Sequence, residues 1–240
     1  MGELKHWMPR HSYPYWMPFI VFIGFFLLQD LGQVLISGLN NIQIIDSKTV
    51  EYIKKNQIYL IYPLKTVVVG ALLILFFRNY PALKPVHFLS SLGIGILGFV
   101  IWVGLDPLLV RRSGEPEGYN PQFLSQGLNG LLLTFRVAGA VLVVPLMEEV
   151  FWRGFLMRYL IREEFEEVRL GTYSHVSFWV TTAFFVSIHG NQWTLAIPVG
   201  LLFGWWFLRT KTLGDVVLAH AVTNLLLGLY VVYTGKWYFW

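Results

Sequence analysis

Three groups of polar residues interrupt the hydrophobic second half of the sequence. Together they contain carboxylates, imidazoles and an amide. Side chains of these types can activate water and stabilise negative charge on a carbonyl oxygen. In chain order these residues are Glu148, Glu149 and Arg153, then His189, then His220 and Asn224. A carboxylate can take a proton from water while neighbouring donors stabilise the developing oxyanion. The set therefore suits hydrolysis of an amide bond without a nucleophilic side chain.

Helical spacing assigns different neighbours to the two glutamates. Residues four apart share one face of a helix, so Glu149 can pair with Arg153. Glu148 is turned by about 100° from Glu149 and can therefore face a different helix. His220 and Asn224 are also four apart and can face one cavity. The pair of Glu149 and Arg153 also has a purely structural interpretation, because pairing lowers the cost of burying either charge.

The positions of the three groups along their segments predict that they converge. Glu148, His189 and His220 lie about 21, 22 and 9 Å from the same side of the bundle, at the rise of an α-helix. An ionisable side chain within a membrane span costs about 2.5–3.5 kcal/mol on insertion scales, so such residues indicate function by default. We therefore expect one water-accessible cavity inside the bundle to collect them.

The composition indicates which fold must hold these residues. The chain has 240 residues, of which 55% are hydrophobic and only 13% are charged, whereas an ordinary soluble domain is about 25% charged. Apolar runs recur along the whole length, and about 20 helical residues cross the hydrocarbon layer of a bilayer. We predict an all-α, polytopic transmembrane helical bundle of about seven spans, within a range of roughly six to eight. The predicted spans are 19–39, 58–77, 88–109, 128–161, 176–189, 195–208 and 216–232.

One predicted span is too long for a straight helix across a bilayer. Residues 128–161 would extend about 50 Å, so we expect a bend or break at Pro145, whose ring removes a backbone donor. Gly93, Gly95 and Gly98 are expected to let helices approach closely. The whole chain, 1–240, is predicted to be a single integral membrane domain with a motif-bearing core at 145–228.

The remaining charges indicate a membrane protein and no nucleic-acid partner. The net charge is +4, but the Lys and Arg residues lie mainly at the ends of apolar runs, as the positive-inside rule describes. More of these basic residues are expected on the side of the membrane that holds the N-terminus, which predicts a cytoplasmic N-terminus. The basic residues on that side are Lys5, Arg10, Arg78, Lys84, Arg158, Arg162, Arg169, Arg209 and Lys211. Four charges inside the predicted spans are interpreted as structural, pairing with one another or reaching an interface. These are Asp30, Lys65, Asp106 and Arg136.

The polar groups also form three ordered motifs that resemble those of a known family. The motifs are Glu-Glu-x-x-x-Arg at Glu148, Glu149 and Arg153, Phe-x-x-x-His at Phe185 and His189, and His-x-x-x-Asn at His220 and Asn224. In this order, each on a hydrophobic segment, they resemble the CAAX protease and bacteriocin-processing (CPBP) family of intramembrane proteases. The chain looks like the bacterial type that includes CAAX prenyl protease relatives accompanying exosortase systems.

The resemblance implies a role for each motif residue. Glu148 would be the base that activates water and His189 its partner, while His220 and Asn224 would stabilise the oxyanion. The supporting or substrate-orienting groups would be Glu149, Arg153 and Phe185. The implied substrate is a peptide or membrane protein, with or without a lipid modification, in a bacterial or archaeal cell membrane.

Two other interpretations use the same residues. In the first, two histidines and a carboxylate bind a catalytic zinc ion, for which they are an acceptable ligand set. The His-Glu-x-x-His pattern of many zinc proteases is absent, and we expect no cofactor. The absence of cysteine excludes disulfides, thiolate zinc ligands and a cysteine nucleophile. The non-enzyme alternative is a scaffold, immunity or transport protein whose buried charges bind a partner or move a proton.

Overall fold

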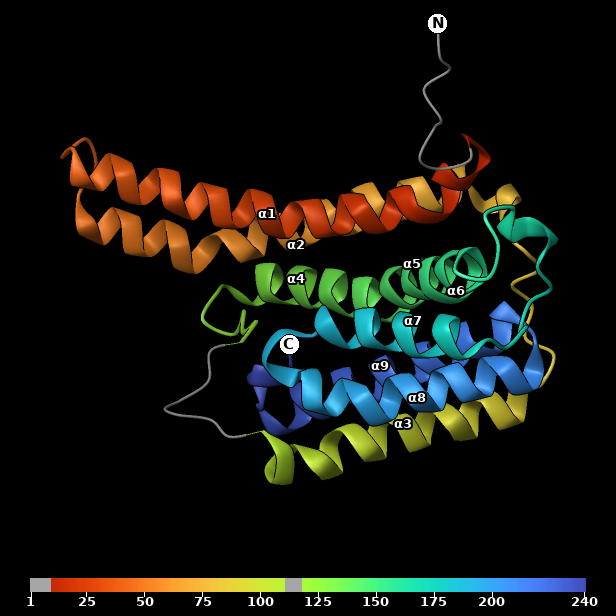
Figure 1. Cartoon of the computed structure of the whole chain (residues 1–240). Coiled ribbons are helices and arrows are strands. Elements are labelled where there is room, and N and C mark those ends of the chain that lie inside the picture. Colours follow the sequence, from red (N-terminus) through yellow and green to blue (C-terminus); the bar gives the residue numbers. More distant parts are fainter. Residues whose placement is uncertain (1–9, 111–117) are drawn as a thin grey trace, which may run out of the picture.

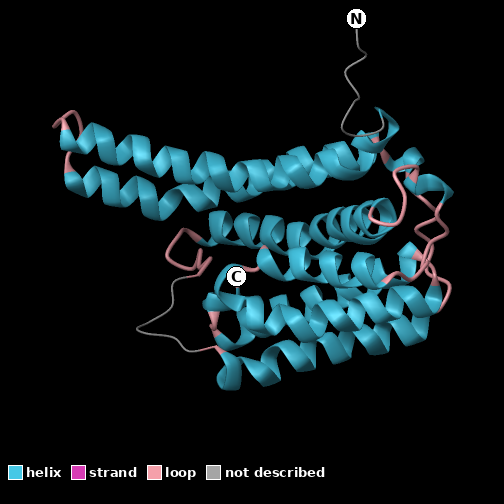
Figure 2. Ribbon diagram, viewed as in Figure 1, coloured by secondary structure: helices cyan, strands magenta, loops and turns pink. Residues whose placement is uncertain are grey.

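The computed structural model describes residues 10–110 and 118–240, and all regular structure in these ranges is helical (Figures 1 and 2). Each of the seven predicted spans is a helical segment. Five helices are long and apolar enough to cross a membrane: Tyr13–Asn41, Ser47–Leu75, Phe88–Leu109, Gln126–Tyr159 and Leu213–Thr234. The predicted polytopic helical bundle is therefore confirmed. Of the residues used to predict the orientation, Lys5 lies outside the described ranges.

The first two helices form a long hairpin on one face of the bundle. Figure 1 shows α1 (Tyr13–Asn41) and α2 (Ser47–Leu75) side by side, with their connected ends projecting beyond the other helices. Asp46 caps α2 by accepting hydrogen bonds from the backbone amides of Lys48 and Thr49, both at 3.0 Å. This cap satisfies donors at the start of α2 that have no partner within the helix.

The long fourth segment does not break at Pro145. It runs as one helical unit, Gln126–Tyr159, in which α4 (Gln126–Ala138), α5 (Val144–Glu149) and α6 (Met157–Tyr159) alternate with two π-helical segments, Gly139–Val143 and Val150–Leu156. Before the proline, the amide of Val144 donates to the carbonyl of Gly139, five residues back. Of the expected bend or break, a break is absent, because wider π-type bonding accommodates the proline within a continuous helix.

The other helices pack below this segment in Figure 1. They are α3 (Phe88–Leu109), α7 (His175–Ser187), α8 (Trp193–Thr210) and α9 (Leu213–Thr234). An added Cβ would lie 2.6 Å from the Ala219 carbonyl oxygen at Gly95 and 2.6 Å from Thr223 Oγ1 at Gly98. The expected close helix approach is therefore confirmed at these two glycines. It is wrong at Gly93, where nothing lies within 4 Å.

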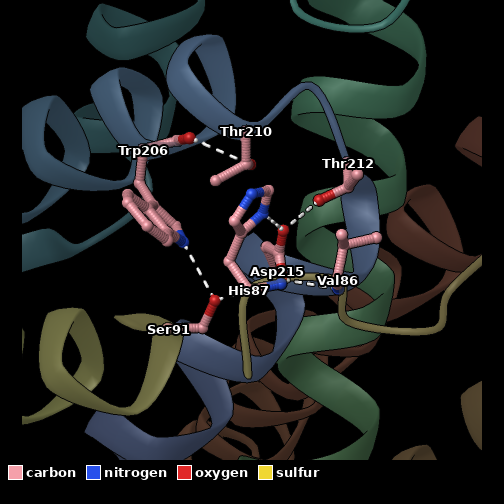
Figure 3. A network of polar contacts seen from close by, with 7 residues as sticks. All are labelled: Val86, His87, Ser91, Trp206, Thr210, Thr212 and Asp215. Atoms are coloured by element: carbon pink, nitrogen blue, oxygen red, sulfur yellow. Dashed lines mark hydrogen bonds and ion pairs between the residues drawn. The ribbon is translucent and has the colours of Figure 1, made fainter. Parts of the chain in front are cut away.

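A buried carboxylate fixes the start of α9 (Figure 3). Asp215 is fully buried, and its Oδ1 accepts hydrogen bonds from the backbone amides of Val86 at 2.9 Å and His87 at 2.8 Å. Its Oδ2 lies 2.9 Å from Nδ1 of His87 and accepts a hydrogen bond from Thr212. Ser91 bonds the same carboxylate and accepts a hydrogen bond from the Trp206 indole at 3.1 Å. The network ties the segment before α3 to α8 and α9.

Candidate active site

The candidate residues lie on three neighbouring parts of the bundle. Glu148 and Glu149 end α5, at the point where the π-helical segment Val150–Leu156 begins. His189 follows directly after α7, while His220 lies inside α9 and is 6% exposed. π-Helical insertions are rare and frequently occur at functional sites. The irregular helix therefore draws attention to the same residues as the sequence motifs.

Glu149 connects the first motif to the last. Its Oε1 lies 2.8 Å from His220 Nδ1 and accepts a hydrogen bond from Arg153 Nη1 at 3.1 Å, while Arg153 Nη1 is 2.9 Å from Oε2. The expected pairing of Glu149 with Arg153 is present. The contact with His220 was not foreseen. Because the carboxylate accepts, His220 Nδ1 carries the proton and its Nε2 is the ring atom left to face a reactant.

Phe185 lies between the motifs and is almost fully buried. Its ring centroid is 4.6 Å from that of His189 and 6.5 Å from that of His220. The guanidinium carbon of Arg153 lies 5.0 Å from the same ring, so the cation packs against the aromatic face. Phe185 thus sets the spacing between the two imidazoles and supports the buried cation.

Gly200 makes this arrangement possible and was not singled out from the sequence. A Cβ at this position would lie only 2.8 Å from the Phe185 ring, and the Gly200 carbonyl accepts a hydrogen bond from Arg153 Nη2 at 3.3 Å. Gly204, one turn further along α8, allows a similar approach of Phe178. The four-residue spacing of these two glycines was the only sequence signal for the close packing of α7 on α8.

The His189 ring has a defined orientation. Its Nδ1 lies 2.7 Å from the carbonyl oxygen of Phe185. A carbonyl oxygen only accepts, so Nδ1 carries the proton and the neutral ring presents the lone pair of Nε2. The ring also packs against Trp102 of α3, with 5.7 Å between centroids. His189 can therefore accept a proton or a hydrogen bond at Nε2.

Glu148 is buried but incompletely bonded. The residue is 5% exposed, and its Oε2 finds no hydrogen-bond donor among the described residues. Within the same ranges no hydrogen bond joins Glu148 to His189 or His220. A buried polar atom without a partner calls for a functional or solvent explanation.

Asn224 lies apart from the imidazoles, one turn further along α9. Its Nδ2 donates a hydrogen bond to the carbonyl of Ala140 at 2.8 Å, within the first π-helical segment. The side-chain amide carries two hydrogens, so one remains for another acceptor. Asn224 also lines a separate cavity of about 410 Å³. The structure therefore groups Glu149, Arg153, Phe185 and both histidines, and leaves Asn224 at the edge of that group.

The geometry of the side chains bears on the zinc alternative. Across residues 10–110 and 118–240, no group of three or more His, Asp or Glu side chains is arranged to hold a metal ion. Glu148, His189 and His220 thus do not form a ready ligand set within these ranges.

Residues 120–226 match the family model described as type II CAAX prenyl endopeptidase Rce1-like. The matched range contains every candidate residue, and the match agrees with the family resemblance that the three motifs indicated. No curated protein and no solved structure matches the chain.

Proposed function

We propose that this chain, which over residues 120–226 belongs to the Rce1-like CAAX endopeptidase family, is an intramembrane endopeptidase that uses Glu148 to activate water. The matched family is a protease family, which implies a peptide substrate and a membrane environment. The observation that carries this proposal is the meeting of all three motifs around Phe185, with Glu149 bonded to His220 at 2.8 Å.

Water activation is assigned to Glu148 with the help of His189. The buried Oε2 of Glu148 has no donor among the described residues, so its lone pairs are free to accept a proton from water. His189 presents Nε2 as a second acceptor, because its Nδ1 is held by the Phe185 carbonyl. Water bound between these acceptors would be polarised toward hydroxide without forming a covalent enzyme intermediate.

Stabilisation of the oxyanion is assigned to His220 and Asn224. His220 donates from Nε2 only when the ring carries both protons, and the carboxylate of Glu149 on Nδ1 stabilises that charged ring. Asn224 contributes the amide hydrogen that Ala140 does not use. Two such donors would stabilise the tetrahedral intermediate more strongly than water does, because the site is buried and preorganised.

Glu149 and Arg153 are assigned as positioning residues. Both are almost fully buried, at 0% and 1% exposed. Their opposite charges offset the cost of placing either group inside the bundle. Glu149 then fixes the ring of His220, while Arg153 reaches the carbonyl of Gly200 on α8. The pair thus supports the reactive groups without contacting the substrate.

The apolar helices support an integral membrane protein, and the proposal extends to its cellular setting. We assign the chain to a bacterial or archaeal cell membrane, with the N-terminus in the cytoplasm. The support is the basic residues at helix ends on the side where α1 begins, α6 ends and α7 begins (Figure 1). Positive residues are retained on the cytoplasmic side during insertion.

Comparative membrane proteomics tests this function without a known substrate. Cells producing the wild-type chain or the Glu148→Gln variant at equal levels are compared for membrane peptides that differ in length. We expect an uncut precursor to accumulate only with the variant, which would also identify the substrate and any lipid on it. Identical peptide profiles, with a biological phenotype intact in Glu148→Gln, would favour a scaffold, immunity or transport role.

A further inference from the structure

A second polar site lies beside the candidate active site, between the α1–α2 hairpin and the helices α4 and α9. It is a cavity of about 410 Å³, within the usual size range of small-molecule pockets. Most of its lining is aromatic or aliphatic. Its polar groups include the side chains of Lys65, Arg136 and Asn224.

Both cations are held against aromatic rings. Lys65 is 5% exposed, with Nζ 4.3 Å from the Phe22 ring centroid and 4.0 Å from that of Phe26. The guanidinium carbon of Arg136 lies 4.4 Å from the Tyr62 ring and 5.2 Å from the Trp240 ring. The two cations thus reach one cavity from different helices.

Neither cation has an anionic partner in the parts of the chain that the structure describes. No Asp or Glu lines the cavity, and the ion pairs of the described residues involve neither Lys65 nor Arg136. The Nε atom of Arg136 is buried and has no hydrogen-bond acceptor there. Two like charges in one apolar cavity repel each other, and cation–π contacts offset only part of the desolvation cost. A bound anion would offset the repulsion between the two cations and the desolvation cost of each, and it would offer an acceptor to Arg136 Nε.

The position of the cavity indicates where that anion comes from. Asn224 lines the cavity and is also the proposed oxyanion donor, one helical turn or about 6 Å along α9 from His220. A group bound by the cations would therefore lie within a few residues of the bond that is cut. The planar fork of Arg136 matches the two oxygens of a carboxylate.

We infer that this cavity binds a carboxylate of the peptide substrate through Lys65 and Arg136 and thereby selects the bond presented to the catalytic groups. The inference rests on the proposed function. The carboxylate can belong to the free C-terminus of the peptide or to an Asp or Glu side chain, and both sources present the same chemistry to the cations.

Binding of three matched probes tests the inference and requires no cleavage. The probes are dodecanoyl-Leu-Phe with a free carboxylate, the same peptide as its C-terminal amide, and dodecanoyl-Leu-Glu amide. Their affinities are measured for the full-length Glu148→Gln protein in phosphatidylcholine nanodiscs. We expect at least one carboxylate probe to bind about tenfold more tightly than the neutral amide. The stronger of the two identifies the source. Equal binding of all three probes, or binding of none, overturns the inference.

Substitutions of Lys65 and Arg136 test whether these two side chains cause the tighter binding of the carboxylate probes. Lys65→Met and Arg136→Gln should each reduce it, whereas Lys65→Arg and Arg136→Lys keep the charge and should retain much of it. Lys55→Met, at an exposed position of the same helix as Lys65, is the matched control. A carboxylate preference that survives Lys65→Met combined with Arg136→Gln contradicts the assignment. So does a preference that vanishes when phosphatidylglycerol replaces phosphatidylcholine, because an anionic lipid headgroup would then occupy the site.

The inference and the proposed function can fail separately. If cleavage survives Glu148→Ala while the carboxylate preference remains, the catalytic assignment falls and the anion site stands. If Glu148 proves essential but acid and amide probes bind equally, only the anion site falls.

Discussion

Glu149 Oε1 lies 2.8 Å from His220 Nδ1, although 71 residues separate the two in the chain. The contact joins the helix of the first motif to that of the last. The surroundings of the two adjacent glutamates differ, because Glu149 Oε1 contacts Arg153 and His220 while Glu148 has no hydrogen bond to either histidine among the described residues. We therefore expect the two residues to differ in function.

The contribution of the Glu149–Arg153 pair to stability should be separable from its contribution to activity. Arg153→Met removes the cation paired with the buried Glu149 carboxylate and leaves it only the contact with His220, which is expected to cost about 3–5 kcal/mol. The double variant Glu149→Gln, Arg153→Met removes both charges and should regain most of the thermal stability in detergent. Activity should stay at least about tenfold below wild type, because the Gln side chain no longer stabilises a charged His220. Wild-type cleavage by the double variant would reduce the pair to a structural role.

Gly200→Ala should disturb the packing around Phe185. The added methyl would lie 2.8 Å from the ring, and overpacking of this kind typically costs about 1–3 kcal/mol. We expect a lower melting temperature and a loss of cleavage, since Phe185 contacts both Arg153 and His189. Gly104→Ala is the control, because nothing lies within 4 Å of its Cβ position. Equal melting temperatures for the two variants would show that α7 and α8 are not packed this closely.

The Asp215 network should contribute to stability without taking part in the reaction. Asp215→Asn keeps the shape but places an amide against Thr212 and His87, so we expect a loss of about 1–3 kcal/mol, measured by thermal unfolding. Asp30→Asn, at an exposed position of α1, should have little effect. An unchanged melting temperature for Asp215→Asn would contradict the contacts in Figure 3.

Metal removal separates the proposed mechanism from the zinc alternative. Cleavage should survive exhaustive chelation, and elemental analysis of the active protein should find no stoichiometric zinc. The reason is that Glu148 and His189 would activate water directly. Loss of activity on chelation, followed by recovery on addition of zinc alone, would support the metal-dependent interpretation instead.

The orientation can be measured directly because the chain contains no cysteine. Single variants Ser47→Cys, at the first residue of α2, and Thr172→Cys, before α7, place thiols near opposite ends of the bundle (Figure 1). In intact cells an impermeant thiol reagent should label position 47 and leave position 172 unlabelled. The reverse pattern would place the N-terminus outside the cytoplasm.

The fold was largely predictable because the length of an apolar run is itself the physical signal for a membrane helix. Helix ends were less predictable. The span predicted at 58–77 is the helix Ser47–Leu75, since the capping of its first turn by Asp46 extends the helix beyond the apolar stretch. Pro145 misled the prediction because local propensity does not reveal that a π-helical segment can accommodate it.

The site was predictable only where contacts are local. The spacing of Glu149 and Arg153 fixes their contact within one helix, whatever the tertiary structure. The contact between Glu149 and His220 depends on how α5 and α9 are aligned, and the position of Phe185 depends on a glycine in α8. No single-sequence pattern carries that alignment. The unpaired Lys65 and Arg136 were expected to find structural partners, but contact aromatic rings instead.

The central claim is that Glu148 takes the proton from the attacking water. Its most direct test is the cleavage rate of purified, reconstituted wild type and Glu148→Gln on the precursor found by proteomics, with exposed Glu163→Gln as the matched control. We predict a decrease of about 100- to 10,000-fold for Glu148→Gln, the usual contribution of a general base, with equal folding and no change for Glu163→Gln. Cleavage by folded Glu148→Gln at the wild-type rate would contradict the mechanism.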